Sequence, residues 1–129
     1  EFRKFIDGSG ADFSGNKIPG LPDHVLHGEI TYKHPSGFYA GVDALYVSSV
    51  FADNANSVKA DANTVTNARV GFSLDRGPWN WTVFGGANNL FDETYSANLR
   101  INAAGGRYFE PAPEANFYAG ASVRYRFGK

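Results

Sequence analysis

Hydrophobic and polar positions alternate with a period of two along most of the chain, and helical periodicity is almost absent. The pattern is clearest in residues 116–127, where one set of alternate positions is apolar or aromatic and the other is small or charged. Because successive side chains of a strand point to opposite faces of a sheet, this pattern predicts a strand with one apolar and one polar face. The same reasoning predicts strands over 24–34, 38–51, 64–75, 79–91 and 116–127, and the end of a further, ambiguous strand over 1–6.

The connections between these strands alternate between short and long. Residues 34–37 and 75–78 are tight turns by composition, since Pro and Gly set their backbone. Residues 7–23, 52–63 and 92–115 are longer segments rich in Gly, Asn, Asp, Ser and Ala. Such alternation is typical of transmembrane β-barrels, in which the periplasmic turns are short and the extracellular loops are longer.

Strand length supports the same interpretation. The expected strands have roughly 10 to 14 residues, more than the five or six that are common in soluble proteins, and enough to cross a membrane at a tilt. Aromatic residues near the strand ends fit the girdles at the two membrane interfaces. A soluble β-sandwich or lipocalin-like barrel would show the same alternation with its apolar face inward. Periodicity identifies the residues that share a face but not the face that is wet, so both interpretations stay open.

Composition excludes several function classes. The chain has 129 residues, with 12 Lys and Arg against 13 Asp and Glu, so it lacks the basic excess of a nucleic-acid binder. The aromatic share of 16% argues against a disordered chain. The absence of Cys excludes a disulfide framework and thiolate chemistry. The chain also lacks a run of about 18 apolar residues that could form a transmembrane helix.

Candidate chemistry is sparse. His24 and His27 lie three residues apart, with Glu29 close by, but residues three apart in a strand point to opposite faces. Polar lining therefore explains them better than a shared metal. No Ser, His and Asp arrangement or pair of carboxylates stands out for catalysis, so we expect neither enzymatic activity nor a cofactor.

Several local strings resemble the C-terminal end of a TonB-dependent outer-membrane receptor. Asn-Leu-Phe-Asp-Glu-Thr-Tyr at 89–95 resembles the string that ends a late strand in that family. Tyr-Phe-Glu-Pro-Ala-Pro at 108–113, followed by Asn-Phe-Tyr-Ala-Gly at 116–120, resembles the approach to the closing strand. Upstream segments at 18–24, 32–41 and 49–56 resemble earlier strings of the family in the same order.

The resemblance implies an all-β fold: an antiparallel up-and-down meander forming the last five or six strands of a large transmembrane β-barrel. The chain begins at Glu1-Phe2 without Met or a signal-peptide pattern, so we expect residues 1–129 to be a C-terminal segment that lacks the plug domain and the earlier strands. The implied location is the bacterial outer membrane. The implied partners are outer-membrane lipid, the remaining strands and plug of the parent protein, TonB, and a ferric siderophore or similar nutrient, with no nucleic acid.

Two positions depart from the family pattern. Gly128 and Lys129 follow Phe127, whereas family members usually stop at the terminal aromatic residue that the assembly machinery recognises. Ala115 stands where the family often has an Arg before Asn-Phe-Tyr. The first departure bears on assembly, and the second on loop contacts near the outer rim.

Residues 92–115 hold the candidate ligand contacts that the resemblance implies. Aromatic and Arg side chains suit anionic or catecholate iron chelates, although ordering of the loop explains them equally well. The candidates are Tyr95, Arg100, Arg107, Tyr108 and Phe109. The i, i+4 spacing of Tyr95 and Leu99 behind Asp92 is compatible with a short helix that ends at Gly105-Gly106, but we interpret the segment as a long extracellular loop.

Two functions remain in competition. The first is a segment of a receptor that imports a ferric siderophore or similar nutrient, energised by TonB. The alternative is an independent small soluble β-barrel or sandwich that binds an apolar or aromatic ligand inside. The two differ in which face of residues 116–127 meets other protein.

Overall fold

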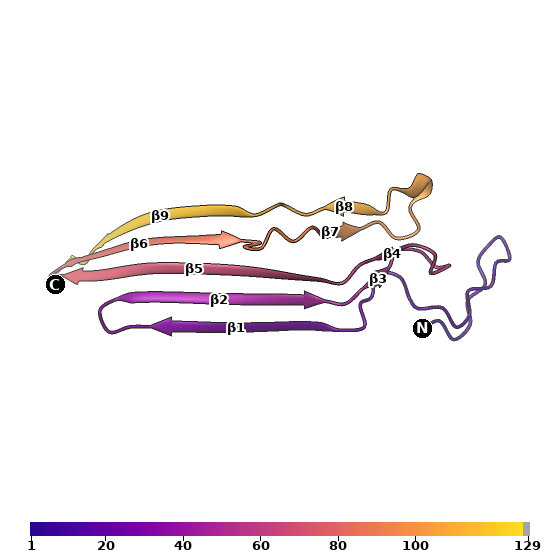
Figure 1. Ribbon diagram of the computed structural model, residues 1–129, viewed down its shortest axis with the longest axis horizontal. Helices are drawn as coiled ribbons and strands as arrows, with labels where there is room; N and C mark the ends of the chain where they lie inside the picture. The colour runs from indigo at the N-terminus through magenta and orange to yellow at the C-terminus, as the bar shows by residue number, and fades with distance from the viewer. Residues whose placement is uncertain (128–129) are drawn as a thin grey trace. The chain divides into compact units, whose positions relative to one another are not determined.

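A computed structural model describes residues 1–127 and is built from strands (Figure 1). No helix in these residues is long and apolar enough to cross a membrane. The chain divides into two compact units. The strand unit comprises residues 27–45, 65–93 and the described part of 114–129, and the loop unit comprises residues 1–26, 46–64 and 94–113.

Five long strands form one sheet in the order β1-β2-β5-β6-β9 (Figure 1). They are β1 (Val25–Lys33), β2 (Phe38–Val47), β5 (Asn63–Arg76), β6 (Trp79–Asn88) and β9 (Asn116–Tyr125). Each is hydrogen-bonded to the next long strand along the chain, and β6 pairs antiparallel with both β5 and β9. The expected all-β antiparallel meander is confirmed, and within residues 1–127 the sheet is open, with β1 and β9 at its edges.

The register of β5, β6 and β9 confirms the two faces predicted from alternation. Val83 of β6 lies opposite Phe72 of β5 and Ala121 of β9, and Trp81 lies opposite Leu74 and Val123. This face stays open: the side chains of Val83 and Val123 are 55% and 50% exposed. Ala87 is the one apolar residue of the strand unit that is buried in the described part of the chain. An apolar face of this kind requires lipid or another chain to cover it.

The opposite face carries the polar cross-strand contacts. Arg69 of β5 forms an ion pair with Glu29 of β1 and lies 3.8 Å from a carboxylate oxygen of Asp43 on β2. The Asn67 amide donates a hydrogen bond of 2.8 Å to Asp43. Three strands thus contribute to one charged cluster, and the polar positions share a face as the sequence predicted.

Arg69 is the only cation of this cluster within the described residues, so its removal should leave two carboxylates without a counter-charge. We expect Arg69→Gln to lower the stability of the assembled protein by about 1 kcal/mol, because the cluster is partly exposed and screened by water. Adding Glu29→Gln should recover part of the loss. The measurement is the temperature at which the folded form loses its distinct mobility on a denaturing gel.

Arg124→Gln is the matched control, because Arg124 lies on the same face and makes no ion pair with residues 1–127. An equal loss of stability in Arg69→Gln and Arg124→Gln would show that the cluster contributes nothing specific.

Aromatic rings lie directly over glycines on this polar face. A Cβ atom built on Gly71 would stand 2.2 Å from the Tyr39 ring, and one on Gly86 would stand 2.4 Å from the Tyr118 ring. On Gly120 it would stand 2.5 Å from the ring of Phe84, its cross-strand neighbour. The ring fills the space that the missing side chain leaves and covers the glycine backbone of the adjacent strand.

Two expectations about the shorter elements are wrong. Residues 1–6 form no strand, and only a single bridge joins Ile6 to Asp12. The expected strand over 38–51 is two strands, β2 and the short β3 (Val50–Phe51), which pairs with β4 (Lys59–Ala60). Two consecutive serines, Ser48 and Ser49, separate β2 from β3.

The alternative of a short helix within 92–115 is also wrong. The segment forms a hairpin of β7 (Ser96–Leu99) and β8 (Phe109–Pro111), joined through a 3₁₀ turn at Ala104–Gly106. Asp92 cannot cap a helix, because its φ is +54° and its carboxylate accepts a hydrogen bond of 2.8 Å from the Ala115 backbone. The departure at Gly128 and Lys129 lies outside the described residues.

A candidate ligand pocket in the loop unit

Asp53 organises the loop that follows β3. The residue is 8% exposed, and its carboxylate accepts hydrogen bonds from the backbone N–H of Ser57 at 2.9 Å and of Val58 at 3.0 Å, and from the Ser57 hydroxyl. Burial alone would raise the pKa of Asp53. The hydrogen bonds from Ser57 and Val58 outweigh burial and lower the pKa below its ordinary value of 3.8. The carboxylate is therefore a charged internal cap for this loop.

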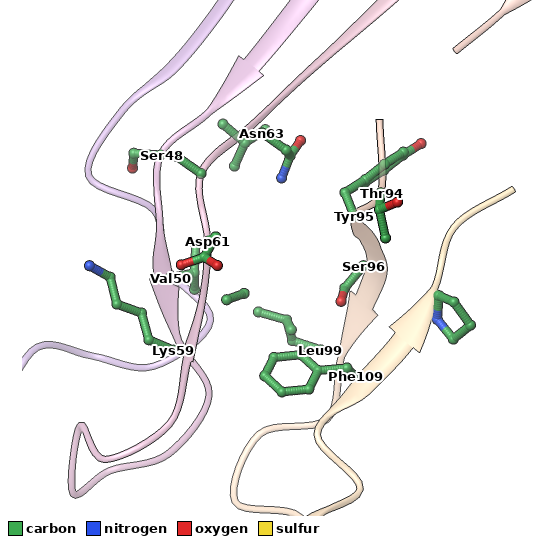
Figure 2. A pocket seen from close by; sticks show the side chains of 14 residues that line it. Ser48, Val50, Lys59, Asp61, Asn63, Thr94, Tyr95, Ser96, Leu99 and Phe109 are labelled. Atoms are coloured by element: carbon green, nitrogen blue, oxygen red, sulfur yellow. The ribbon is translucent and has the colours of Figure 1, made fainter. Parts of the chain in front are cut away.

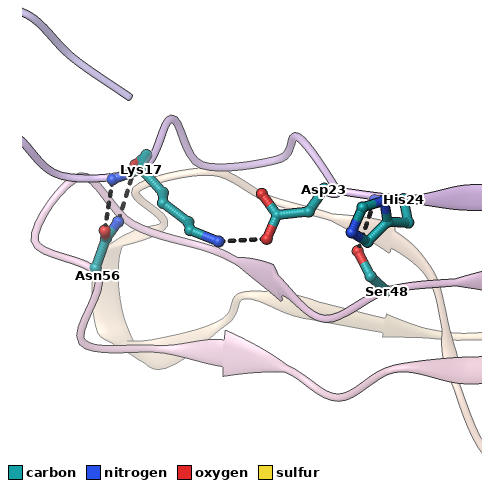
Figure 3. Close-up of polar contacts among 5 residues, drawn as sticks. All are labelled: Lys17, Asp23, His24, Ser48 and Asn56. Carbon is teal, nitrogen blue, oxygen red and sulfur yellow. Dashed lines mark hydrogen bonds and ion pairs between the residues drawn. The ribbon is translucent and has the colours of Figure 1, made fainter.

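Asparagine side chains connect this loop to two distant segments. The Asn56 amide accepts a hydrogen bond of 2.8 Å from the Lys17 backbone N–H and donates one of 2.9 Å to the Lys17 carbonyl (Figure 3). The Asn102 side chain accepts a hydrogen bond of 2.8 Å from the Asn54 backbone N–H. Asn56 and Asn102 have φ near +56° and +54°, a conformation that Asn tolerates better than most residues. Residues 17, 53–58 and 102 thus form one hydrogen-bonded framework.

A second set of contacts joins the beginning of β1 to the end of β2. The His24 backbone N–H donates to the Ser48 hydroxyl at 3.1 Å, and the Ser48 N–H donates to the His24 carbonyl at 3.0 Å. Lys17 forms an ion pair with Asp23 (Figure 3), and its hydrogen bond lowers the pKa of the Asp23 carboxyl. The contacts between His24 and Ser48 hold the beginning of β1 next to the end of β2, where the residues that line the pocket begin.

A pocket of about 420 Å³ lies in the loop unit between the β3–β4 hairpin and the β7–β8 hairpin (Figure 2). Its apolar lining includes Val50 from the first hairpin and Leu99 and Phe109 from the second. Hydroxyl groups come from Ser48, Thr94 and Ser96. Lys59 and Asp61 also line the pocket. The pocket thus combines apolar walls, hydroxyl groups and one residue of each charge, a lining that suits a small molecule.

The structure brings together two of the five side chains that the sequence nominated. Tyr95 and Phe109 line this pocket. Tyr108 lines a separate hollow of about 370 Å³ beside Asp53 and Asn102. Arg100 donates from Nε to Glu110 at 2.6 Å. The hydrogen bond from Asn98, together with this contact to Arg100, lowers the pKa of the Glu110 carboxyl. Arg107 is exposed and lines neither space.

Sequence reasoning missed the first hairpin as part of a site. Val50, Lys59 and Asp61 line the pocket although they lie more than thirty residues before Tyr95 in the chain. The available signal was the Asp-Asn-Ala-Asn string at 53–56, whose residues favour turns and left-handed backbone and so indicate an ordered loop. Within residues 1–127, no group of three His, Asp or Glu side chains is placed to hold a metal ion.

Asp53 provides a stability test in this framework. Asp53→Ala should leave the Ser57 and Val58 N–H groups without their acceptor and destabilise the loop locally by about 1 to 3 kcal/mol. Ser57→Ala should cost less, because it removes only the hydroxyl contact. The measurement is amide hydrogen exchange at residues 57 and 58, corrected for intrinsic rates.

The same contacts predict a dependence on pH. Because the pKa of Asp53 is lower in the folded protein, its contribution is fully present above pH 3.8 and is lost as the pH falls through the lower, folded-state value. Protection of residues 57 and 58 should therefore decrease at acid pH in the wild-type protein and stay low at every pH in Asp53→Ala. Equal protection of both proteins at neutral pH would contradict this role.

An open antiparallel meander with one exposed apolar face and one polar face has the construction of a transmembrane β-barrel wall. Comparison with models of known families matches residues 2–90 to the TonB dependent receptor-like, beta-barrel family. The match covers more than half of the chain, and the chain belongs to this family of bacterial outer-membrane receptors. The matched residues include β1, β2, β5 and β6, whereas β9 and the β7–β8 hairpin lie beyond them.

Proposed function

We propose that the chain is the C-terminal segment of the barrel of an outer-membrane receptor that imports a ferric siderophore or similar nutrient, energised by TonB. Membership of the family carries the receptor function, which is transport rather than catalysis. The open sheet supports the assignment to a larger barrel, because a small closed barrel would have no edges and a sandwich would cover its apolar face.

We assign a proposed partner to each edge and each face of the sheet. In a bilayer, each unsatisfied backbone group costs several kcal/mol, so β1 and β9 require neighbouring strands of the parent barrel. The face with Val83 and Val123 contacts outer-membrane lipid. The face with Glu29, Asp43 and Arg69 contacts the wet interior or the plug domain. The parent protein engages TonB through its N-terminal part.

The connectivity of the meander supports an extracellular position for the segments that line the pocket. The tight turns β1–β2 and β5–β6 join strands at one end, and the long segments 48–62 and 89–115 join them at the other. In outer-membrane barrels the longer loops are extracellular. The loop unit, with Tyr95 and Phe109 in its pocket, would then face the medium from which the ligand arrives. Arg100, Arg107 and Tyr108 remain secondary candidates for ligand contact.

The test is uptake of radioiron by cells that produce the receptor in their outer membrane under iron limitation. We expect uptake of a ferric siderophore that disappears when either the receptor or TonB is deleted and returns when each is restored. Equal uptake with and without TonB would contradict the proposed energy source. TonB-dependent uptake of a nutrient that contains no iron would correct the ligand while retaining the receptor function.

A further inference from the structure

We propose that the pocket between the β3–β4 and β7–β8 hairpins binds a ligand that carries no net negative charge, such as an uncharged ferric chelate. This inference rests on the proposed receptor function and narrows its ligand. It departs from the expectation of an anionic or catecholate chelate, which rests on the residue types of 92–115 and not on their contacts.

The walls of the pocket favour an amphipathic ligand. Figure 2 shows Leu99 and Phe109 together on the β7–β8 side of the pocket, which faces the β3–β4 hairpin. Val50 on the opposite side is 7% exposed, and Phe109 is 44% exposed and available for contact. The hydroxyls of Thr94 and Ser96 add uncharged hydrogen-bonding groups. An uncharged chelate with an apolar flank complements this lining.

Lys59, which lines the pocket, and Arg100 both contact other side chains. The ammonium of Lys59 lies 5.9 Å from the centre of the Phe51 ring, and Phe51 is not among the residues that line the pocket. In Figure 2 the Lys59 side chain extends away from Leu99 and Phe109. Arg100 is paired with Glu110 at 2.6 Å and does not line the pocket. The lining therefore offers an anionic ligand no cation that is directed toward Leu99 and Phe109.

Acidic side chains in and around the pocket also disfavour binding of an anionic ligand. Asp61 lines the pocket, and no residue of 1–127 forms an ion pair with it. In the loop unit as a whole, acidic side chains slightly outnumber Lys and Arg. A polyanionic chelate would approach Asp61 with like charge, whereas a neutral chelate would only need to offer the carboxylate a hydrogen-bond donor.

The experiment measures equilibrium binding of two iron(III) complexes to the receptor in outer-membrane vesicles: an uncharged cyclic trihydroxamate and a polyanionic tris-catecholate. We expect the wild-type protein to bind the trihydroxamate more tightly. Phe109→Ala should weaken trihydroxamate binding about tenfold, as expected for loss of one buried aromatic contact. Leu21→Ala is the control, because Leu21 is 63% exposed in the same unit and lies outside the lining.

A charge variant separates the electrostatic argument from packing. Asp61→Lys changes an exposed residue of the lining and should strengthen tris-catecholate binding by a larger factor than it changes trihydroxamate binding. The quantity of folded receptor in the vesicles, measured by its mobility on a gel without heating, normalises each variant.

Three results would overturn the inference. They are tighter binding of the tris-catecholate by the wild-type protein, trihydroxamate binding that survives both Phe109→Ala and Leu99→Ala, and binding of neither complex. The proposed receptor function is judged separately by TonB-dependent uptake. Uptake of the tris-catecholate alone would thus retain that function and reject the uncharged ligand.

Discussion

Val83→Arg should destabilise the folded protein in a membrane by about 2 to 4 kcal/mol, the cost of a basic side chain on the lipid face near the bilayer midplane. Val83 stands in the middle of β6, opposite Phe72 and Ala121, and its side chain is 55% exposed on the apolar face. In lipid, a guanidinium at this position would lose its hydration without gaining a partner. The measurement is the free energy of unfolding in urea, with the receptor reconstituted in lipid vesicles.

Ser122→Arg is the matched control. Ser122 lies opposite Thr82 on the polar face, one strand away from Val83 and close to the same depth in the sheet. In the wet interior of a barrel its guanidinium would stay hydrated, so the change should cost little. Ala121 lies opposite Val83 on the apolar face, so a spin label at position 121 should report lipid. If Ser122→Arg were the more damaging of the two variants, the assignment of the faces would be reversed.

The sequence predicts the strand unit well because a single physical rule controls it. Alternation assigns Val83 and Arg69 to opposite faces, and lipid on one side with water on the other requires that assignment along every strand. Proline and glycine likewise identify the turns at 34–37 and 75–78, where local backbone geometry decides the structure. Strand faces and tight turns both depend on residues that are close in sequence, so they can be predicted from one sequence.

The loop unit is less predictable because its contacts join segments that are distant in sequence. Asn56 binds the backbone of Lys17, and Asn54 binds the side chain of Asn102, at separations of 39 and 48 residues. Sequence periodicity does not predict contacts of this kind. For the same reason the sequence predicts the five candidate side chains but not which of them lie together. Arg100 suits an anionic ligand by residue type, but the structure pairs it with Glu110. The type of a side chain suggests a class of ligand, but its ion pairs within the protein determine how much of its charge is available to that ligand.

The glycines of the polar face also make contacts that the sequence does not predict, and substitution of one of them should strongly destabilise the protein. Gly86→Ala should destabilise the protein by about 1 to 3 kcal/mol, the usual cost of forcing an extra methyl into a filled space. A Cβ atom at this position would stand 2.4 Å from the Tyr118 ring and 2.7 Å from the Ala68 backbone oxygen. The ring can rotate away, but the oxygen belongs to the adjacent strand and moves only if the β5–β6 pairing is distorted.

Gly85→Ala provides the control at the next residue of the same strand. Its Cβ atom would stand 3.3 Å from the Tyr118 backbone oxygen and 3.9 Å from the Ala119 side chain, on the opposite face of the sheet. Both substitutions add one methyl to β6 and change the freedom of the unfolded chain equally, so their difference isolates the contact with Tyr118 and Ala68. Adding Tyr118→Ala to Gly86→Ala should recover only the part of the loss that the ring causes. Equal urea midpoints for Gly85→Ala and Gly86→Ala would show that Tyr118 does not pack over Gly86 in the membrane.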